Sequence, residues 1–568
     1  MTEPEQTADA VARPSEIPLG VVIALAAAVA FAYTFSLGMG ALAEPDEPRY
    51  AEIAREMLAR HDWVTPTLNY VKYFEKPPLV YWLNMIVFRC FGFSDTLARA
   101  VPVACTLCTL VLTGIIGRQL YDRWVAVVAV AVLAASPLML AMGQTLTLDP
   151  ALTLTLTAAL VCFWFGYHDA ARRPRLYRTM YVFVALAVLV KGPVAIVLSG
   201  ATVAGFLLTR LDGRALLRVL DPVGLALFAA VALPWFVLVS VRNPEFLNFF
   251  VMDQHLKRFL SPEEHRQGIW FFLPFAFAGV MPWSIGLLMI PAEWRALARW
   301  RTWSPGTWFC LIWAAVIIGF FSLSASKLAT YILPALPPLA LLCARALQRI
   351  VAGNAPFASR LGVFFTYLGW AMAAGGVGVG SAVLLQRADL VHVDPELAQI
   401  LTRIVVPLFA GGGAMVLTGW LLGRSESAPR GLAIAAGGWL VLMCAAMAGR
   451  DATTSYRALG RAIHANIQPT DQVVIYHHYV QGIPLYSERR AVLVGARGEL
   501  AFGAEQGDQR DFFWPQDQRL IEAWASATRL FLVINRSELE PLRLQLSSTP
   551  IEIAAEGKKV VVINHPLG

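Results

Sequence analysis

Residues 17–57, IPLGVVIALAAAVAFAYTFSLGMGALAEPDEPRYAEIAREM, join a long apolar run to a segment crowded with charge. The apolar part carries no charged side chain and exceeds the roughly 20 residues that a helix needs to cross a bilayer. Residues 42–57 then place five carboxylates and two arginines within sixteen positions. This pattern predicts a membrane span followed at once by a folded, charged loop. No cleavable signal peptide is expected, because no basic segment precedes the apolar run.

The rest of the chain has the composition of a membrane protein. Hydrophobic residues make up 57% of the 568 positions and charged residues only 15%, which favours a polytopic α-helical fold. Apolar runs predict about thirteen spans, near residues 18–41, 96–118, 123–142, 148–167, 177–191, 193–209, 219–241, 269–291, 305–323, 328–348, 361–386, 401–423 and 430–449.

Arginine indicates the orientation of these spans. The net charge of +7 comes from 39 arginines and seven lysines, and the arginines between spans fall in alternate connections, which the positive-inside rule assigns to the cytoplasm. The opposite side then holds the loop 42–95, the loop 242–268 and the tail from residue 450. The modest net charge gives no support for a nucleic-acid partner.

The tail, residues 450–568, changes character and predicts a soluble α/β domain outside the membrane. Four apolar segments read as strands: QVVIYHH, RAVLVG, RLFLVIN and KVVVINH. They alternate with amphipathic segments that read as helices, YRALGRAIHANI, QRLIEAWASA and LEPLRLQLS. The tail contains no nucleotide-binding fingerprint and no cysteine, so neither a nucleotide donor nor a disulfide framework is expected.

The first loop, residues 42–95, is predicted to fold as a lid with two helices on the membrane surface, one from Pro48 and one after Pro77. Asp46 lies at the start of the first helix. One interpretation makes it part of an N-cap ahead of Pro48, and the other gives it a chemical role. The two interpretations remain open at this point.

Lysines point to an anionic ligand on the outer side. Five of the seven map to the outer membrane boundary, where topology disfavours cations: Lys72, Lys76, Lys191, Lys257 and Lys327. A lysine is a compact partner for phosphate. The alternative for each is that its ammonium reaches lipid head groups.

Further polar residues recur at the same boundary. Asp149 opens a span in TLTLDPALTLTL, where an N-cap is again an alternative, and the loop 242–268 supplies His255 and Arg258. Lys327 and Tyr331 are four residues apart, which predicts one helical face. The alternative for this last pair is independent membrane anchoring.

Several of these motifs resemble one family. The segments EPDEPRYAEIAREM, YFEKPPLVYWL, LTLDPAL, LVKGPVA and SKLATYILPALPPLAL resemble the aminoarabinose (ArnT-type) transferases, which are protein O-mannosyltransferase-like enzymes of the GT-C fold. The resemblance runs from about residue 40 to residue 345. It implies a GT-C transmembrane domain over residues 1–449, with the C-terminal domain at 450–568, and transfer of 4-amino-4-deoxy-L-arabinose from undecaprenyl phosphate to lipid A phosphates, which gives resistance to polymyxin.

The resemblance also implies roles for residues. Asp46, Asp149, Glu75 and Lys76 are expected to act in catalysis, and the lipid phosphate or substrate is expected to contact Arg49, Tyr73, Lys191, Arg258, Lys327 and Tyr331. Asp46 is expected to orient the sugar or stabilise positive charge rather than act as a base, because an acceptor phosphate is already an anion. A zinc ion at Glu75 and His255 is a further possibility, since both are ligand types that zinc accepts.

Two rival functions remain. A GT-C relative with another sugar, or with a protein hydroxyl as acceptor, would share the fold but need a general base. A lipid transporter or flippase would leave the folded loop and the outer domain without a purpose. Under the main interpretation we expect a monomer in the bacterial inner membrane, with its active site on the periplasmic side and with lipids as its partners.

Overall fold

The computed structural model describes residues 17–38, 40–257, 267–284, 303–353, 355–387, 395–422, 428–448, 455–495 and 497–567. The chain divides into two compact units. The first unit comprises Met1–Leu37, Pro102–Phe236 and Val251–Gly449, and the second comprises Gly38–Val101, Val237–Phe250 and Arg450–Gly568. The second unit resumes at Arg450, where the C-terminal domain was predicted to begin, and it also contains the first loop, which was predicted as part of the transmembrane domain.

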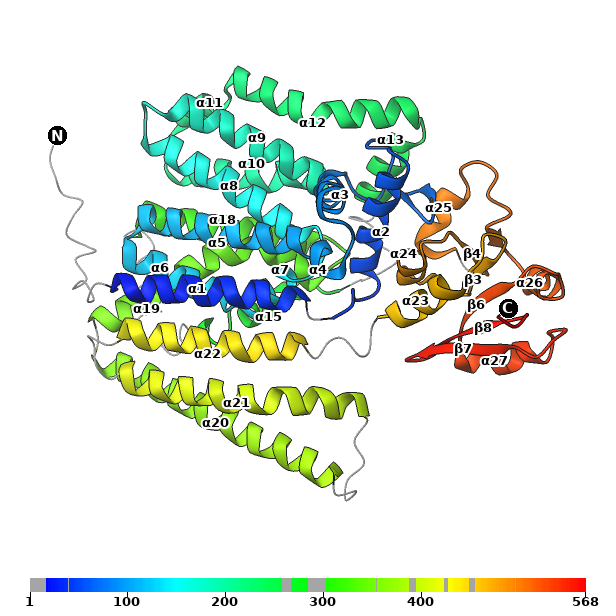
Figure 1. Ribbon diagram of the computed structural model, residues 1–568. Coiled ribbons are helices and arrows are strands. Elements are labelled where there is room, and N and C mark those ends of the chain that lie inside the picture. The colour runs from blue at the N-terminus through cyan, green and yellow to red at the C-terminus, as the bar shows by residue number, and fades with distance from the viewer. Residues whose placement is uncertain are drawn as a thin grey trace. The chain divides into compact units, whose positions relative to one another are not determined.

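The first unit is built of helices (Figure 1). They are α1 (Leu19–Phe35), α5 (Ala100–Leu120), α6 (Arg123–Ala134), α7 (Pro137–Gly143), α8 (Asp149–His168), α9 (Arg173–Lys191), α10 (Val194–Thr209), α11 (Gly213–Val219), α12 (Pro222–Arg242), α15 (Phe272–Gly279), α18 (Pro305–Leu323), the 3-10 helix η4 (Ala329–Ala335), α19 (Leu336–Gly353), α20 (Ala355–Arg387), α21 (Pro395–Leu422) and α22 (Ala428–Ala448). Helix α5 begins and helix α12 ends in the second unit.

Only some of these helices are long enough to span a membrane. Within the described ranges, seven helices are long and apolar enough to cross a bilayer, or eight if α6 and α7, which meet at 64°, form one broken span. The multi-pass class is confirmed, whereas the predicted count of thirteen is not. Some predicted spans fall on shorter apolar helices such as α1 and α10, and the predicted span 269–291 ends outside the described residues.

The apolar surface of the first unit fits a lipid environment. In an 18-residue apolar segment of each helix, only 17% of α20 and 22% of α12 is buried within the protein. Side chains on them such as Trp370 and Leu233 are 62% and 50% exposed. Continuous apolar exposure of this kind is unfavourable in water but suits contact with lipid tails.

Helices α20 and α21 lie side by side (Figure 1), and their backbones approach closely at glycines. A methyl group added at Gly369 would lie 2.5 Å from the carbonyl oxygen of Gly412, and one added at Gly419 would lie 2.4 Å from that of Gly362. Any side chain at these positions would separate the helices. Small residues therefore allow the close approach that stabilises helix pairs in lipid.

The second unit contains the first loop in folded form. The loop forms α2 (Asp46–Ala59), the two-stranded ribbon β1 (Thr67–Leu68) and β2 (Val71–Lys72), α3 (Leu79–Phe91) and α4 (Asp95–Ala98). The short α13 (Phe246–Asn248) follows the end of α12 in this unit and leads into the π-helix η2 (Phe249–Lys257). Both predicted helices of the loop, α2 and α3, are confirmed.

The C-terminal domain of the second unit is a six-stranded sheet in the order β5-β4-β3-β6-β8-β7. Strands β3 (Gln472–Tyr476), β4 (Ala491–Val494), β5 (Phe513–Trp514) and β6 (Leu530–Asn535) are parallel, and β8 (Lys559–Ile563) and β7 (Ile551–Glu556) pair antiparallel at one side. The helices of the domain are α23 (Arg457–Asn466), α24 (Gly482–Ser487), η7 (Gly498–Leu500), α25 (Ala501–Ala504), α26 (Asp517–Trp524) and α27 (Arg536–Arg543). All four predicted strands are confirmed, whereas β5 and β7 were not predicted.

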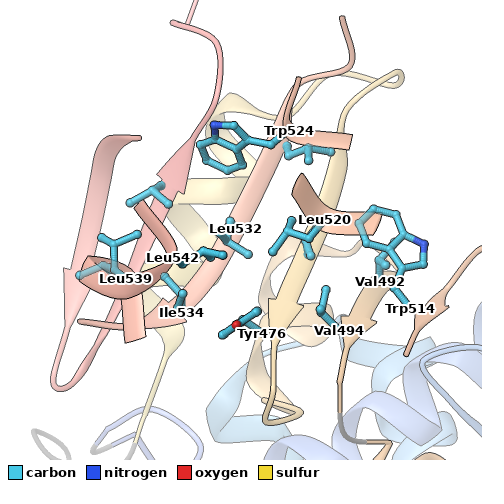
Figure 2. Packing of buried hydrophobic residues seen from close by; sticks show 14 residues of the cluster. Tyr476, Val492, Val494, Trp514, Leu520, Trp524, Leu532, Ile534, Leu539 and Leu542 are labelled. Atoms are coloured by element: carbon cyan, nitrogen blue, oxygen red, sulfur yellow. The ribbon is translucent and has the colours of Figure 1, made fainter. Parts of the chain in front are cut away.

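Helices cover both faces of this sheet. Figure 2 shows one face, where Leu520 and Trp524 of α26 and Leu539 and Leu542 of α27 pack on strand residues such as Leu532. The other face buries Leu459 and Ile463 of α23. Burial on both faces explains why the parallel strands read as continuous apolar runs rather than as alternating ones.

Candidate active site

Helix α2 places the acidic residues of the first loop in different surroundings. Its N-cap residue is Pro45, and no side chain caps it, so the N-cap interpretation of Asp46 is wrong. The Asp46 carboxylate instead accepts a hydrogen bond from Arg49, with 2.7 Å between Oδ1 and Nη1. The Asp46 side chain is 51% exposed. It is therefore held by one partner and still open to a ligand.

Glu47, its neighbour, is buried and has a structural partner. Arg99 donates to both Glu47 carboxylate oxygens, with distances of 2.8 Å and 2.7 Å. The Glu47 side chain is only 1% exposed. Of the two adjacent acids, Glu47 is thus used for folding, and Asp46 remains available for chemistry.

Arg49 bridges two carboxylates. Besides Asp46 it contacts Glu499 of η7, with 2.6 Å between Nε and Oε2. Glu499 also accepts hydrogen bonds from the Tyr73 hydroxyl at 3.3 Å and from the side-chain amide of Gln481. Burial raises the pKa of the Glu499 carboxyl. Sequence reasoning missed Glu499, which lies in a domain that shows few motifs, and no local signal marked it.

Tyr73, Glu75 and Lys76 follow strand β2 in the same unit. Tyr73 is 3% exposed, and its hydroxyl is directed to Glu499. Lys76 Nζ donates to the carbonyl oxygen of Glu75 at 3.1 Å. Glu75 lies near enough to Tyr73 for its charge to help burial raise the pKa of that phenol. The structure thus brings four predicted residues of the first loop, Asp46, Arg49, Tyr73 and Glu75, into one electrostatic neighbourhood, with Lys76 beside Glu75.

In the first unit, Asp149 and Lys191 form an ion pair. Asp149 is the first residue of α8 and Lys191 the last of α9, and 2.5 Å separates Oδ1 from Nζ. The N-cap of α8 is Leu148, without a side-chain cap bond, so Asp149 is not a cap. The Lys191 ammonium also lies over the Tyr331 ring, 4.6 Å from its centroid. Three predicted residues from distant parts of the sequence therefore form one cluster in this unit.

The predicted pairing of Lys327 with Tyr331 is wrong in its geometry. Lys327 precedes η4 and is not helical, so the two do not share a helical face. Lys327 is 4% exposed, and its ammonium donates to the backbone carbonyl of Gln267 at 2.9 Å and to that of Ser324. The proline-containing 3-10 turn replaces the predicted α-helix here. Tyr331 is instead directed to Lys191.

Some predicted site residues lie outside the described part of the chain. These are Arg258 as a whole and the side chains of His255 and Lys257. Lys72, one of the boundary lysines, forms an ion pair with Glu245. Among the residues that the structure describes, no group of three or more His, Cys, Asp or Glu side chains could hold a metal ion. The pairing of Glu75 with His255 in a zinc site stays a prediction.

Comparisons with known proteins agree with this architecture. Residues 19–250 match the family model for dolichyl-phosphate-mannose-protein mannosyltransferase, and residues 459–565 match the aminoarabinose transferase C-terminal domain. The undecaprenyl phosphate-α-4-amino-4-deoxy-L-arabinose arabinosyl transferase of Erwinia tasmaniensis is 32% identical over 416 residues, covering 71% of this chain and 73% of that protein. Its counterpart from Sodalis glossinidius is 34% identical over 54% of this chain and 56% of that protein.

Solved structures give the same result at the level of the whole chain. The crystal structure of ArnT from Cupriavidus metallidurans bound to undecaprenyl phosphate is 27% identical, with a TM-score of 0.80, covering 97% of this chain and 99% of that one. The oligosaccharyltransferase AglB from Archaeoglobus fulgidus shares the fold at 14% identity and a TM-score of 0.52.

Proposed function

Since this chain belongs to the family of the undecaprenyl phosphate-α-4-amino-4-deoxy-L-arabinose arabinosyl transferases, we propose that it transfers 4-amino-4-deoxy-L-arabinose from undecaprenyl phosphate to a phosphate of lipid A. It is a multi-pass membrane glycosyltransferase of the GT-C fold with a lipid-linked donor. We further propose that it acts as a monomer in the bacterial inner membrane and that the reaction takes place on the periplasmic side. Resistance to cationic antimicrobial peptides would follow from the positive charge that the amino sugar adds to lipid A.

The position of Asp46 is the observation that supports this function best. Of the two acids at the start of α2, Asp46 is half-exposed and pairs with Arg49, whereas Glu47 is buried against Arg99. A carboxylate held in place with one side open suits a substrate that carries or develops positive charge. The donor offers both, a cationic amino group and an anomeric carbon that becomes positive in the transition state.

The reaction itself needs no proton abstraction. The bond between the anomeric carbon and the donor phosphate breaks, and its electron pair leaves with undecaprenyl phosphate. An anionic oxygen of the acceptor phosphate forms the new bond to that carbon. We assign Asp46 to stabilising the sugar cation rather than to general base catalysis, because the acceptor is already ionised at neutral pH.

We propose that lysine side chains bind the phosphate groups of the lipid substrates. The proposed phosphate-binding lysines are Lys76 of the second unit and Lys191 of the first. The Lys191 ammonium is already oriented by Asp149 and by the Tyr331 ring. Such preorganisation lowers the free energy needed to place positive charge where the departing phosphate becomes negative.

The central experiment measures transfer by the purified chain. Lipid A incubated with the enzyme and the lipid-linked aminoarabinose is analysed by mass spectrometry, and a gain of one aminoarabinose mass is expected. The variant Asp46→Asn should lose transfer while remaining folded. The matched control is Asp62→Asn, because Asp62 lies in the same loop and caps the backbone amides of Val64 and Thr65. Transfer should persist in that control.

Each outcome bears on a different rival. No mass gain with the parent protein would sink the aminoarabinose assignment. Labelling of a protein hydroxyl instead would favour a mannosyltransferase-like enzyme, and movement of lipid without covalent change would favour a flippase. Full activity of Asp46→Asn would remove this carboxylate from the chemistry.

A second experiment tests the phosphate assignment of Lys76. Binding of undecaprenyl phosphate should weaken more in Lys76→Glu than in Lys76→Arg, since the phosphate requires the positive charge more than one donor geometry. Charge reversal at the exposed Lys558 in the same unit is the control. If Lys76→Glu binds the lipid as tightly as the parent, Lys76 only faces head groups.

A further inference from the structure

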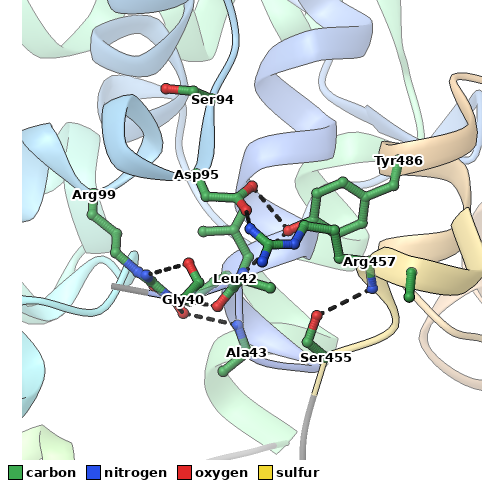
Figure 3. A network of polar contacts seen from close by, with 12 residues as sticks. Gly40, Leu42, Ala43, Ser94, Asp95, Arg99, Ser455, Arg457 and Tyr486 are labelled. Carbon is green, nitrogen blue, oxygen red and sulfur yellow. Dashed lines mark hydrogen bonds and ion pairs between the residues drawn. The ribbon is translucent and has the colours of Figure 1, made fainter. Parts of the chain in front are cut away.

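The C-terminal domain contacts the first loop through polar pairs within the second unit. Asn69 of the loop and the backbone of Ala491 exchange two hydrogen bonds, each of 2.8 Å. Asp95 forms an ion pair of 2.7 Å with Arg457 (Figure 3). The domain and the loop that carries Asp46 therefore fold against one another, and the domain can influence the geometry of that loop.

Glu499 is the contact that reaches the candidate site. It approaches Arg49 at 2.6 Å, and Arg49 in turn approaches Asp46 at 2.7 Å. The Tyr73 hydroxyl and the Gln481 amide donate to the remaining lone pairs of Glu499. Its side chain is 15% exposed. A largely buried carboxylate with two hydrogen-bond donors and one ion-pair partner is fixed in position.

The charges of Asp46, Arg49 and Glu499 do not cancel. One guanidinium faces two carboxylates, so the group carries one net negative charge. The Glu499 side chain is 15% exposed and is held by Arg49, Tyr73 and Gln481, whereas Asp46 is half-exposed. The net charge is therefore available to a ligand at Asp46. An isolated pair of Asp46 with Arg49 would be neutral and would attract a cation far less.

We propose that Glu499 is a positioning residue of the transferase: it fixes the Arg49 guanidinium and takes up its charge, so that Asp46 keeps a negative charge for the sugar cation. The inference rests on the proposed function, since it assumes that Asp46 acts on the sugar. It gives the C-terminal domain a part in catalysis. The effect is expected in the transition state, where the positive charge on the sugar is largest.

The test compares two substitutions that each neutralise a carboxylate between the loop and the domain. In Glu499→Gln, kcat for aminoarabinose transfer should fall by about tenfold or more while KM for the donor changes by less than about threefold. Asp95→Asn removes the charge of the other ion pair, which does not involve Arg49. Its kcat should stay within about twofold of the parent. Glu499→Asp keeps the charge and should retain more activity than Glu499→Gln.

The unfolding temperature of each variant in detergent separates positioning from stability. The proposal is supported if Glu499→Gln is folded and loses kcat whereas Asp95→Asn, with an equal or lower unfolding temperature, does not. It is overturned if Glu499→Gln keeps the parent kcat, if it does not fold, or if kcat in both variants falls in step with the unfolding temperature. A parent enzyme that transfers no aminoarabinose refutes the proposed function by itself, whatever the variants do.

Discussion

Arg99 anchors the start of the first loop, and its removal should loosen α2. Its guanidinium donates to both carboxylate oxygens of Glu47, at 2.8 Å and 2.7 Å, and to the carbonyl oxygen of Ala41 at 2.7 Å. It also donates to the carbonyl oxygen of Gly40 at 3.0 Å (Figure 3). Both charged side chains are almost fully buried. The substitution Arg99→Met keeps an unbranched side chain but leaves the Glu47 carboxylate without this guanidinium.

The expected effect is large because one buried charge loses its counter-charge. Removing one partner of a buried ion pair destabilises a protein by about 3–5 kcal/mol. The backbone amides of α2 exchange with solvent when the helix opens locally. Each 1.4 kcal/mol changes the equilibrium constant for this opening tenfold. Amide exchange in α2 should therefore accelerate by roughly 150- to 4000-fold. Hydrogen exchange of the full chain in detergent, read by mass spectrometry, measures this directly.

Two further variants make the test specific. Arg172 pairs with Asp169 on an exposed surface, where its side chain is 80% exposed, so Arg172→Met should leave exchange in α2 unchanged. Replacing both members of the buried pair, as in Glu47→Met with Arg99→Met, should restore much of the protection, because an apolar pair leaves no buried charge. If exchange of α2 in Arg99→Met accelerates by less than about threefold, the pair does not stabilise the loop as reasoned.

Three other predictions follow from single contacts. Burial raises the pKa of the Glu44 carboxyl from 4.5 to about 7, so its contribution to stability is complete below about pH 4.5 and is lost as the pH rises through about 7. Protection of the α24 amides from hydrogen exchange should therefore fall between these two pH values in the parent but not in Glu44→Gln. A double-mutant cycle on kcat/KM should show coupling of about 0.5–2 kcal/mol between Lys191→Ala and Tyr331→Leu, whereas Lys327→Ala and Tyr331→Leu should be additive within about 0.5 kcal/mol. A methyl group at Gly503 would lie 2.4 Å from a carbonyl oxygen of β2, so Gly503→Ala should lower the unfolding temperature, and an unchanged value would show that β2 moves freely.

Local sequence patterns predicted the elements that depend on local physics. A run of apolar residues predicts a span because backbone groups in lipid must be satisfied within one helix, which needs no knowledge of neighbours. The four strand predictions in the C-terminal domain held for a similar reason, since a short apolar run bounded by turn residues is typical of a buried strand. Two short or exposed strands, β5 and β7, carry no such signal. The motifs of the first loop also indicate the family and single out Asp46, because each motif lies within one short stretch of the chain.

The partners of the charged residues were decided only by the tertiary structure. Sequence reasoning placed Asp149 and Lys191 at the membrane boundary but could not show that they contact one another. It selected Asp46 but could not show that the fold buries the adjacent Glu47 against Arg99 and leaves Asp46 half-exposed. No sequence pattern indicated Glu499, because its partner Arg49 is 450 positions away in the sequence. Helical and strand periodicity specifies which face of an element is buried, but an ion pair depends on which distant element covers that face, and only the packed chain determines that.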